Sequence, residues 1–239
     1  MGIARTVRRI YSTAMTRSGL AALQRWRLRR RVVIMTYHDV DAAVFASHLA
    51  FLAGAYRIVP LADAVRWLRG EADLPERALA ITFDDGFRSF YTDVYPVLQR
   101  YRAPATVFLT TGYIGSDDIL WFNWVDLALS SGAALPDALP ASLRGLQGRQ
   151  LRRRLMPYLK SAPDDERLEI VQLLRERTSV SPEQVARHRL MTWHDAREMQ
   201  ASGLVSLGGH TRSHPILSRA GLAKAEAEIF GCATDLQRE

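Results

Sequence analysis

Short apolar runs, rich in β-branched residues, recur along the chain and alternate with longer segments in which apolar residues repeat every three or four positions. Runs of the first kind are typical of strands buried on both faces, and the second pattern is typical of helices that bury one face. Strands that alternate with helices predict an α/β fold with a parallel sheet or barrel. Four such strands are expected, at residues 31–37, 78–83, 105–110 and 205–209.

Helices are expected between the first three strands, and Pro96 should kink the last of them because proline cannot donate a backbone hydrogen bond. Two further helices are predicted toward the end of the chain. Thr192 is suited to cap the first of these, and Gly203 is suited to end it. The predicted helices cover residues 44–56, 61–68, 87–101, 193–202 and 222–236.

The segment from about residue 115 to residue 190 does not follow this alternation. It holds no convincing strand, and its helical stretches are separated by joints rich in proline, alanine and glycine. We therefore predict a helical insertion on one face of the fold. Its helices are expected around residues 121–130, 147–159 and 164–177.

Charge divides the chain into two parts. The net charge is +7, yet residues 1–31 contain nine arginines and no acid, so the remainder is slightly acidic. The basic character belongs to an N-terminal arm, residues 1–30, and a single domain is expected over residues 31–239, a length sufficient for a real core. This distribution does not support a domain-wide surface for nucleic acid, and no nucleic-acid partner is expected. Cys232 is the single cysteine, so no intramolecular disulfide can form.

The arm has the pattern of an amphipathic basic helix. Ile3, Val7, Ile10 and Ala14 recur on one side, and the arginines lie largely off it. Such a helix can lie on an anionic membrane surface, or it can pack on the domain with its arginines in solvent. The arm contains no apolar run of the kind that forms the core of a signal peptide. The expected location is the cytoplasm or the cytoplasmic face of the membrane.

Residues suited to bind a metal follow two of the predicted strands. Asp84, Asp85 and Gly86 come directly after one strand, and His210 and His214 follow the last. In parallel α/β folds ligands collect at the carboxyl ends of the strands. A cation would relieve the repulsion between adjacent carboxylates, and two imidazoles with one carboxylate form a typical catalytic zinc ligand set.

Each motif alone is a weak signal. Two aspartates and a glycine at a strand end often form only a structural turn, and two histidines four residues apart more often lie at the surface than around a metal. Pro215 disfavours a helix at His214, so a strand-end loop is expected there. The combination favours function, because both strands deliver their residues to the same end of the sheet.

The motifs Thr82–Gly86 and His210–Pro215 together resemble the polysaccharide deacetylases of carbohydrate esterase family four, the NodB-homology group. The similarity covers roughly residues 31–239. It implies a distorted (β/α) barrel and a metal-dependent hydrolysis of N-acetyl groups on sugars of a polysaccharide or its precursor. Asp85, His210 and His214 match the metal ligands of the family, with Zn²⁺ the expected ion, and Asp84 matches its catalytic base. Further matching segments are Tyr37–Val40, Pro104–Phe108, Trp121 and Met191–Trp193.

The catalytic acid of much of this family is a histidine on a late strand. Here the sequence from Ile34 to Asp39 is similar to that late motif, placed at the front of the chain. Members that act on poly-N-acetylglucosamine are permuted in the same way. His38 is therefore the expected acid, although a histidine at a strand end can also be structural. His194 is a weaker candidate.

One departure from the family lies at the end of the chain. Members usually continue into a further strand that lines the site and supplies an oxyanion donor, whereas this sequence stops at Glu239 within the preceding helix. The expectation is a barrel that is incomplete at its C-terminus, in a truncated form of a longer enzyme.

Two alternatives to a sugar N-deacetylase remain open. One is a related hydrolase of non-sugar amides or O-acetyl esters. The other is a catalytically impaired binding or accessory protein. Trp121, Phe122 and Trp124 are suited to stack on sugar rings, which favours a carbohydrate substrate. Aromatic residues at this spacing are nevertheless more often part of a core.

Overall fold

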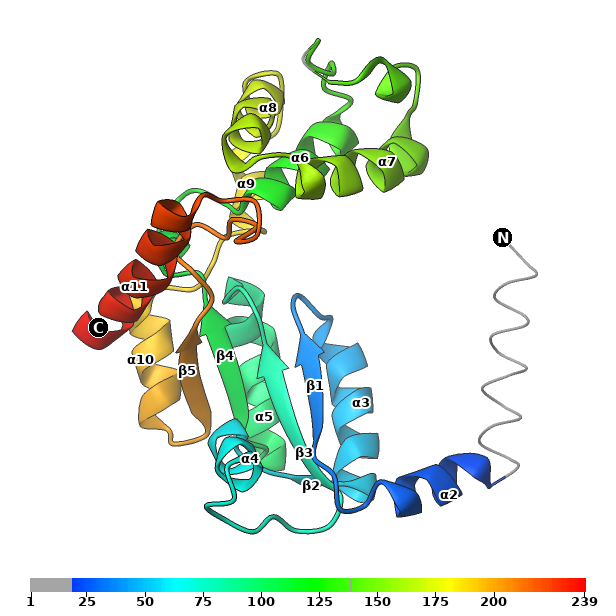
Figure 1. Cartoon of the computed structure of the whole chain (residues 1–239), viewed down its shortest axis with the longest axis vertical. Coiled ribbons are helices and arrows are strands. Elements are labelled where there is room, and N and C mark those ends of the chain that lie inside the picture. Colours follow the sequence, from blue (N-terminus) through cyan, green and yellow to red (C-terminus); the bar gives the residue numbers. More distant parts are fainter. Residues whose placement is uncertain (1–18, 138) are drawn as a thin grey trace.

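A computed structural model describes residues 19–137 and 139–239 and contains one parallel sheet (Figure 1). Its main strands are β1 (Val33–Tyr37), β3 (Ala78–Phe83), β4 (Ala105–Leu109) and β5 (Val205–Gly209). They pair in the order β1-β3-β4-β5, and the short β2 (Arg57–Ile58) pairs with the start of β3. Every pairing is parallel, which confirms the α/β class. The carboxyl ends of the four main strands therefore lie at one edge of the sheet.

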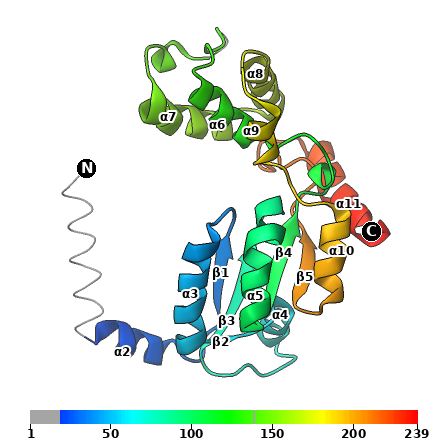
Figure 2. The same cartoon turned by 180° about the vertical axis from the view of Figure 1, so that it is seen from behind.

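The helices α3 (Ala42–Ala55), α5 (Tyr95–Tyr101) and α10 (Trp193–Ala201) cover one face of this sheet (Figure 2). On that side Phe83 of β3 meets Phe45 of α3, with ring centroids 5.3 Å apart. Both side chains are buried in the main hydrophobic core. Burying a side chain of this size stabilises the fold by roughly 1.5–3 kcal/mol. On the other face the cover is less complete, because Ile34 of β1 is 49% exposed.

Pro96 changes the helix in which it lies. The segment predicted as one kinked helix over residues 87–101 contains a π-helical turn, η1 (Phe90–Val94), directly before α5. Proline has no N–H to offer to the carbonyl four residues before it, and a π turn is one way of accommodating such a break. The predicted kink thus takes the form of a local change in hydrogen-bond pattern near the start of α5.

The predicted helical insertion is present and lies beyond the carboxyl ends of the strands (Figure 1). A hydrophobic cluster of its own, separate from the main core, includes Val125, Leu155 and Leu174. Asp165 and Glu166 are exposed in the first turn of the helix Asp164–Glu176, where their negative charges suit the positive end of the helix dipole. The insertion consists of α6 (Trp121–Ser131), η3 (Ala141–Leu143), α7 (Gly148–Ser161), α8 (Asp164–Glu176) and α9 (Pro182–Ala186).

The remaining helices are α2 (Leu20–Arg27), α4 (Leu61–Leu68) and α11 (Leu222–Arg238), and η2 (Thr111–Tyr113) follows β4. The predicted capping of α10 is confirmed, since Thr192 Oγ1 accepts the backbone N–H of Asp195 at 3.1 Å. The amphipathic stripe predicted at Ile3, Val7, Ile10 and Ala14 lies outside the described residues. Among the helices that are described, none is both long and apolar enough to cross a bilayer.

Candidate metal centre

Three adjacent strands carry the two predicted motifs to one place. Asp84 and Asp85 directly follow β3, and His210 directly follows β5. The strand between them, β4, is bonded to both motifs at its end: Thr110 donates its backbone N–H to the carbonyl of Asp85 at 3.1 Å, and His210 donates to the carbonyl of Leu109 at 2.8 Å. These backbone bonds fix how far apart the two motifs lie.

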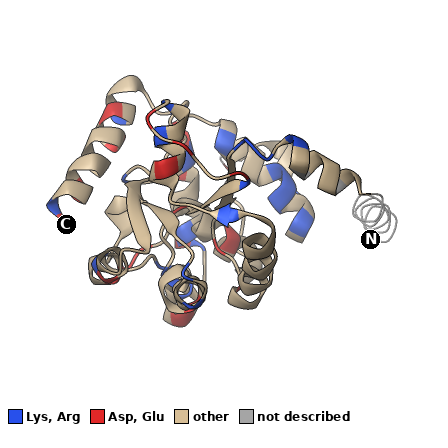
Figure 3. Ribbon diagram, turned by 90° about the horizontal axis from the view of Figure 1, so that it is seen from below, with Lys and Arg blue, Asp and Glu red and all other residues tan. Residues whose placement is uncertain are grey.

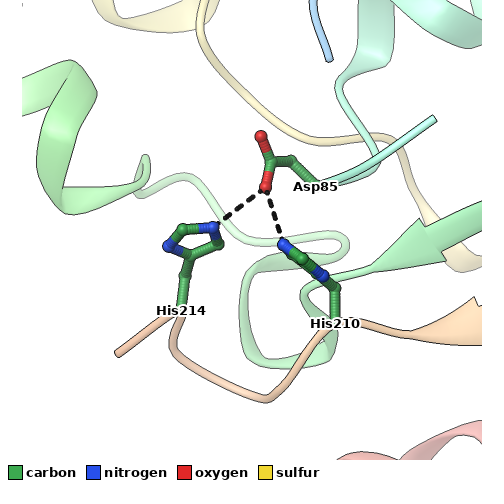
Figure 4. Close-up of side chains that lie close together, drawn as sticks. All are labelled: Asp85, His210 and His214. Atoms are coloured by element: carbon green, nitrogen blue, oxygen red, sulfur yellow. Dashed lines mark ion pairs between the residues drawn. The ribbon is translucent and has the colours of Figure 1, made fainter. Parts of the chain in front are cut away.

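The side chains of Asp85, His210 and His214 converge (Figure 4). Asp85 Oδ1 lies 3.2 Å from Nε2 of His214 and 3.6 Å from Nε2 of His210. One ligand atom from each residue lies within 4.8 Å of the other two. Ligands about 2.0–2.2 Å from a tetrahedral ion are roughly 3.3–3.6 Å from one another, so the separations of 3.2 and 3.6 Å are close to those expected around such an ion. The three residues can hold a divalent metal.

The environment of Asp85 suits a metal ligand better than a structural carboxylate. Its side chain is 1% exposed, and neither carboxylate oxygen has a hydrogen-bond partner in the described part of the chain. A buried charge without a partner is costly, and a bound cation removes most of that cost. Nδ1 of His214 is also buried without a hydrogen bond. The unsatisfied carboxylate next to two imidazoles is the observation that best fits a metal.

The charge state of His210 also suits coordination. Burial lowers the pKa of its imidazole below the ordinary value, and the proximity of His214 lowers it further. The carboxylates of Asp85 and Asp84 oppose this shift but do not reverse it. A histidine with a lowered pKa is mostly neutral at neutral pH, and the neutral ring is the form that binds a metal.

His38 and Asp84 form a pair beside these three residues. Nε2 of His38 lies 3.7 Å from Oδ2 of Asp84. The backbone supports this pairing, because the N–H of Asp84 donates to the carbonyl of Tyr37 at 2.9 Å. The His38 side chain is 60% exposed and that of Asp84 is 18% exposed, so both can reach solvent. The structure therefore brings all five predicted site residues to one edge of the sheet.

His194, the weaker candidate for the acid, is exposed at the start of α10. Within the described residues, no hydrogen bond or ion pair joins it to the two aspartates or to His38. It remains apart from the pairs that the other candidates form.

Several backbone angles at the centre are unusual. Asp85, Thr211 and His214 have φ values of 72°, 66° and 57°, in the left-handed region that side chains other than glycine rarely adopt. Such strain persists only where surrounding contacts maintain it, and it is concentrated at functional sites. Two of these residues belong to the segment 210–215, which we call the histidine loop.

Gly86 is required by its surroundings. Its φ is 88°, and a Cβ there would lie 2.7 Å from Cδ2 of Leu109. We expect Gly86→Ala to destabilise the fold by about 1–3 kcal/mol, because both the backbone and the packing must shift. Urea unfolding measures this change, with Gly54→Ala as the control, since a Cβ at Gly54 meets nothing within 4 Å. Equal stability of the two variants would contradict the described packing at Gly86.

Two of the three aromatic residues predicted to stack on sugar, Trp121 and Phe122, contact the histidine loop. Trp121 is 3% exposed, and its Nε1–H donates to the carbonyl of His214 at 3.0 Å. The ring of Phe122 meets the ring of His214 edge to face, with centroids 5.3 Å apart. Trp124 donates to Asp118 and is covered by the guanidinium of Arg175. The suggestion that Trp121 stacks on sugar is therefore wrong, because its ring is inside the protein.

Comparison with known proteins identifies the family to which this chain is similar. The family model for polysaccharide deacetylases matches residues 71–238. The chain is 33% identical over 89 residues to the poly-β-1,6-N-acetyl-D-glucosamine N-deacetylase of Escherichia coli (strain K12), a match that covers 37% of this chain and 13% of that protein. It is 35% identical over 52 residues to the enzyme of the same name from Staphylococcus aureus (strain MSSA476), covering 22% of this chain and 18% of that protein. The chain thus spans a minor part of these relatives.

A solved structure supports the fold independently. IcaB from Ammonifex degensii is similar with a TM-score of 0.53 and 19% sequence identity, over 87% of this chain and 68% of that one. At this identity the similarity concerns the fold. The match of the family model covers well over half of the residues and includes both motifs. The chain belongs to the polysaccharide deacetylase family.

Proposed function

We propose that this protein removes N-acetyl groups from the sugars of a polysaccharide or its precursor, using a divalent metal held by Asp85, His210 and His214. The observation that carries the proposal is the buried carboxylate of Asp85, which has no hydrogen bond and faces two imidazole nitrogens. Zn²⁺ is the proposed ion, because two imidazoles and one carboxylate that leave a position open are a ligand set of catalytic zinc. When bound, such a metal polarises a carbonyl group and makes water more acidic.

Asp84 and His38 supply the proton transfers in this proposal. The attacking water must lose a proton, and the carboxylate of Asp84, next to the ligand Asp85 in the chain, can accept it. The amine that leaves the sugar amide must gain a proton, and His38 can donate one. Nε2 of His38 is 3.7 Å from Oδ2 of Asp84, so one substrate amide can lie within reach of both groups.

The exposed surface at His38 and Asp84 suits a sugar better than the cavity beside His210 and His214. A cavity of about 730 Å³ lies against His210 and His214, but its walls contain neither aspartate. Those walls are largely aliphatic, with Leu217, Ile229 and Leu236 among them. Recognition of a sugar requires polar groups that bind its hydroxyls. We therefore place the substrate where His38 and Asp84 are exposed, and not in this cavity.

A panel of acetylated substrates tests the reaction class. With Zn²⁺ supplied, we expect acetate release from oligomers of β-1,6-linked N-acetylglucosamine, and slower or no release from O-acetylated sugars and from N-acetylated amino acids. Preference for an ester or for a non-sugar amide would instead support the related-hydrolase alternative. Metal binding without acetate release from any member of the panel would support a binding or accessory role.

The N-terminal helix provides a further part of the proposal, contact with an anionic membrane surface. Leu20, Leu23 and Trp26 of α2 recur every three residues and are 51%, 44% and 59% exposed. Arginines 27, 30 and 31 next to them are exposed as well, and basic residues are dense in this part of the chain (Figure 3). Apolar side chains beside arginines are typical of helices that bind at the membrane interface. We propose that this contact is made at the cytoplasmic face of a membrane.

We expect the protein to sediment with vesicles that contain phosphatidylglycerol and not with vesicles of phosphatidylcholine alone. The double change Leu23→Ser and Trp26→Ser should weaken this binding about tenfold or more, because both side chains lose their apolar burial. Phe51→Ser is the matched control, since Phe51 is 63% exposed and belongs to α3, not to the apolar stripe of α2. Equal binding by the double variant and the control would exclude α2 as the contact.

A further inference from the structure

The helix α11 carries a buried acid that the proposed reaction does not use. Glu228 is 7% exposed. Its Oε2 accepts the backbone N–H groups of Arg212 and of Ser213, both at 2.8 Å. Its Oε1 accepts a bond from the hydroxyl of Ser213. All three bonds go to the histidine loop, between the two histidines.

The backbone of the loop explains why a side chain with an oxygen acceptor is needed at this position. Thr211 has a left-handed φ of 66°, and successive N–H groups after such a residue point into one concavity that attracts an anion. Without Glu228, the N–H groups of Arg212 and Ser213 would lose their acceptor in a partly buried place. The conformation of the loop and the carboxylate of α11 therefore depend on each other.

A second acid on the same face of α11 supports the first. Asp235 is 6% exposed; its Oδ2 accepts from Oγ1 of Thr111 at 2.8 Å and from Nε of Arg212 at 2.9 Å. Gly231 leaves space for this, because a Cβ there would lie 2.5 Å from Cδ of Arg212. The loop is thus bonded to α11 at two positions. It is bonded to the segment after β4 through Asp235 and also directly, because the backbone N–H groups of Thr111 and Gly112 donate to the carbonyls of Thr211 and Arg212 at 3.1 and 2.9 Å.

Hydrogen bonds within the loop and from α6 connect these contacts to the two histidines. The backbone N–H of His214 donates to Oγ1 of Thr211 at 3.1 Å, and Thr211 in turn bonds to the carbonyl of His210. On the other side, Trp121 donates to the carbonyl of His214. These bonds connect the backbone at residues 212 and 213 to the backbone of both histidines.

We propose that Glu228 is a positioning residue that holds the histidine loop in the conformation in which Nε2 of His210 and Nε2 of His214 both face Asp85. The proposal rests on the metal site of the proposed function and extends it to a residue that contacts neither metal nor substrate. Residues that orient metal ligands typically change metal affinity by about 10–100-fold when they are replaced.

The test compares three substitutions at Glu228. Glu228→Gln preserves the shape of the side chain. Its amide oxygen can still accept the two N–H groups, and its amide nitrogen can donate to the Ser213 hydroxyl. We therefore expect the Zn²⁺ affinity of this variant to be within about threefold of the original. Glu228→Leu removes every bond, and Glu228→Asp shortens the side chain so that the carboxylate cannot reach both N–H groups. For these two variants we expect Zn²⁺ affinity to fall about 10–100-fold. The Asp variant decides the matter if the Leu variant does not fold.

The affinity is measured by competition with a chromophoric chelator, and the visible spectrum of the Co²⁺ form reports ligand geometry. Leu52→Ala is the control; Leu52 is buried in α3, so this variant should melt earlier and yet bind Zn²⁺ as before. Unchanged affinity and an unchanged Co²⁺ spectrum in both the folded Leu and Asp variants would overturn the role of Glu228.

Hydrogen exchange in the metal-free protein separates this inference from the proposed function. Amide exchange in the peptide that contains the histidine loop should be at least about tenfold faster in Glu228→Asp than in Glu228→Gln. If the original protein bound no metal, the metal assignment would be wrong, and exchange alone would decide whether Glu228 orders the loop. Equal exchange in the two variants would contradict the inference whatever the metal does.

Discussion

Asp84→Asn is expected to reduce acetate release by about 10²–10⁴-fold while Zn²⁺ affinity stays within about threefold of the original. The neutral amide has the shape of the carboxylate but cannot take a proton from water. Asp84 is not one of the three residues whose atoms converge as ligands, so the metal should remain bound. The measurement is the initial rate of acetate release together with the Zn²⁺ dissociation constant, on the same preparation.

Asp63→Asn is the matched control for this change, because Asp63 lies on α4 and its ion pair with Arg66 is at the surface. This control should release acetate at the original rate. Full activity in Asp84→Asn would show that another group accepts the proton, and loss of Zn²⁺ from that variant would move Asp84 into the ligand set.

Asp85→Asn is expected to weaken Zn²⁺ binding at least about 100-fold and, in the metal-free state, to leave the melting temperature unchanged or raised. The carboxylate of Asp85 is buried without a hydrogen bond, and a neutral amide costs less to bury than a charge. The original protein, by contrast, should gain about 2.7 kcal/mol of stability when Zn²⁺ is present at 100 times its dissociation constant. The variant should gain almost none of this.

Thermal unfolding in the presence of chelator and in the presence of Zn²⁺ measures both effects. Asp84→Asn serves as the control here, since it should still be stabilised by the metal. If Asp85→Asn melted clearly earlier than the original protein under chelator, Asp85 would be a structural residue, and the fit to a metal would lose its main support.

The strands were predictable from the sequence because short apolar runs rich in β-branched residues are typical of buried strands. The apolar runs at Ala78–Phe83 and Val205–Gly209 form strands with the predicted bounds. The two-residue β2 was not predicted, since Arg57 and Ile58 are too few to form a pattern. The helix α2 was read as part of a basic arm, and its own boundaries required the structure.

The site was predictable as far as strand ends could place it. Asp84, Asp85 and His210 directly follow strands, so the expectation of parallel strands was enough to place them at the same end of the sheet. Trp121 and Glu228 were harder to interpret, because an aromatic residue near a site suggests sugar binding and an acid on a helix suggests solvent. The signal for Glu228 lies in the spacing of Glu228, Cys232 and Asp235, which places two acids on the buried face of α11.

The most direct test of the central claim is acetate release from β-1,6-linked N-acetylglucosamine oligomers, measured while Zn²⁺ is titrated into chelator-treated protein. The account predicts no release without metal, and a rate that rises with bound Zn²⁺ and levels off at one equivalent per chain. A rate that is the same before and after chelation, or a fully metal-loaded chain that releases no acetate, would contradict it.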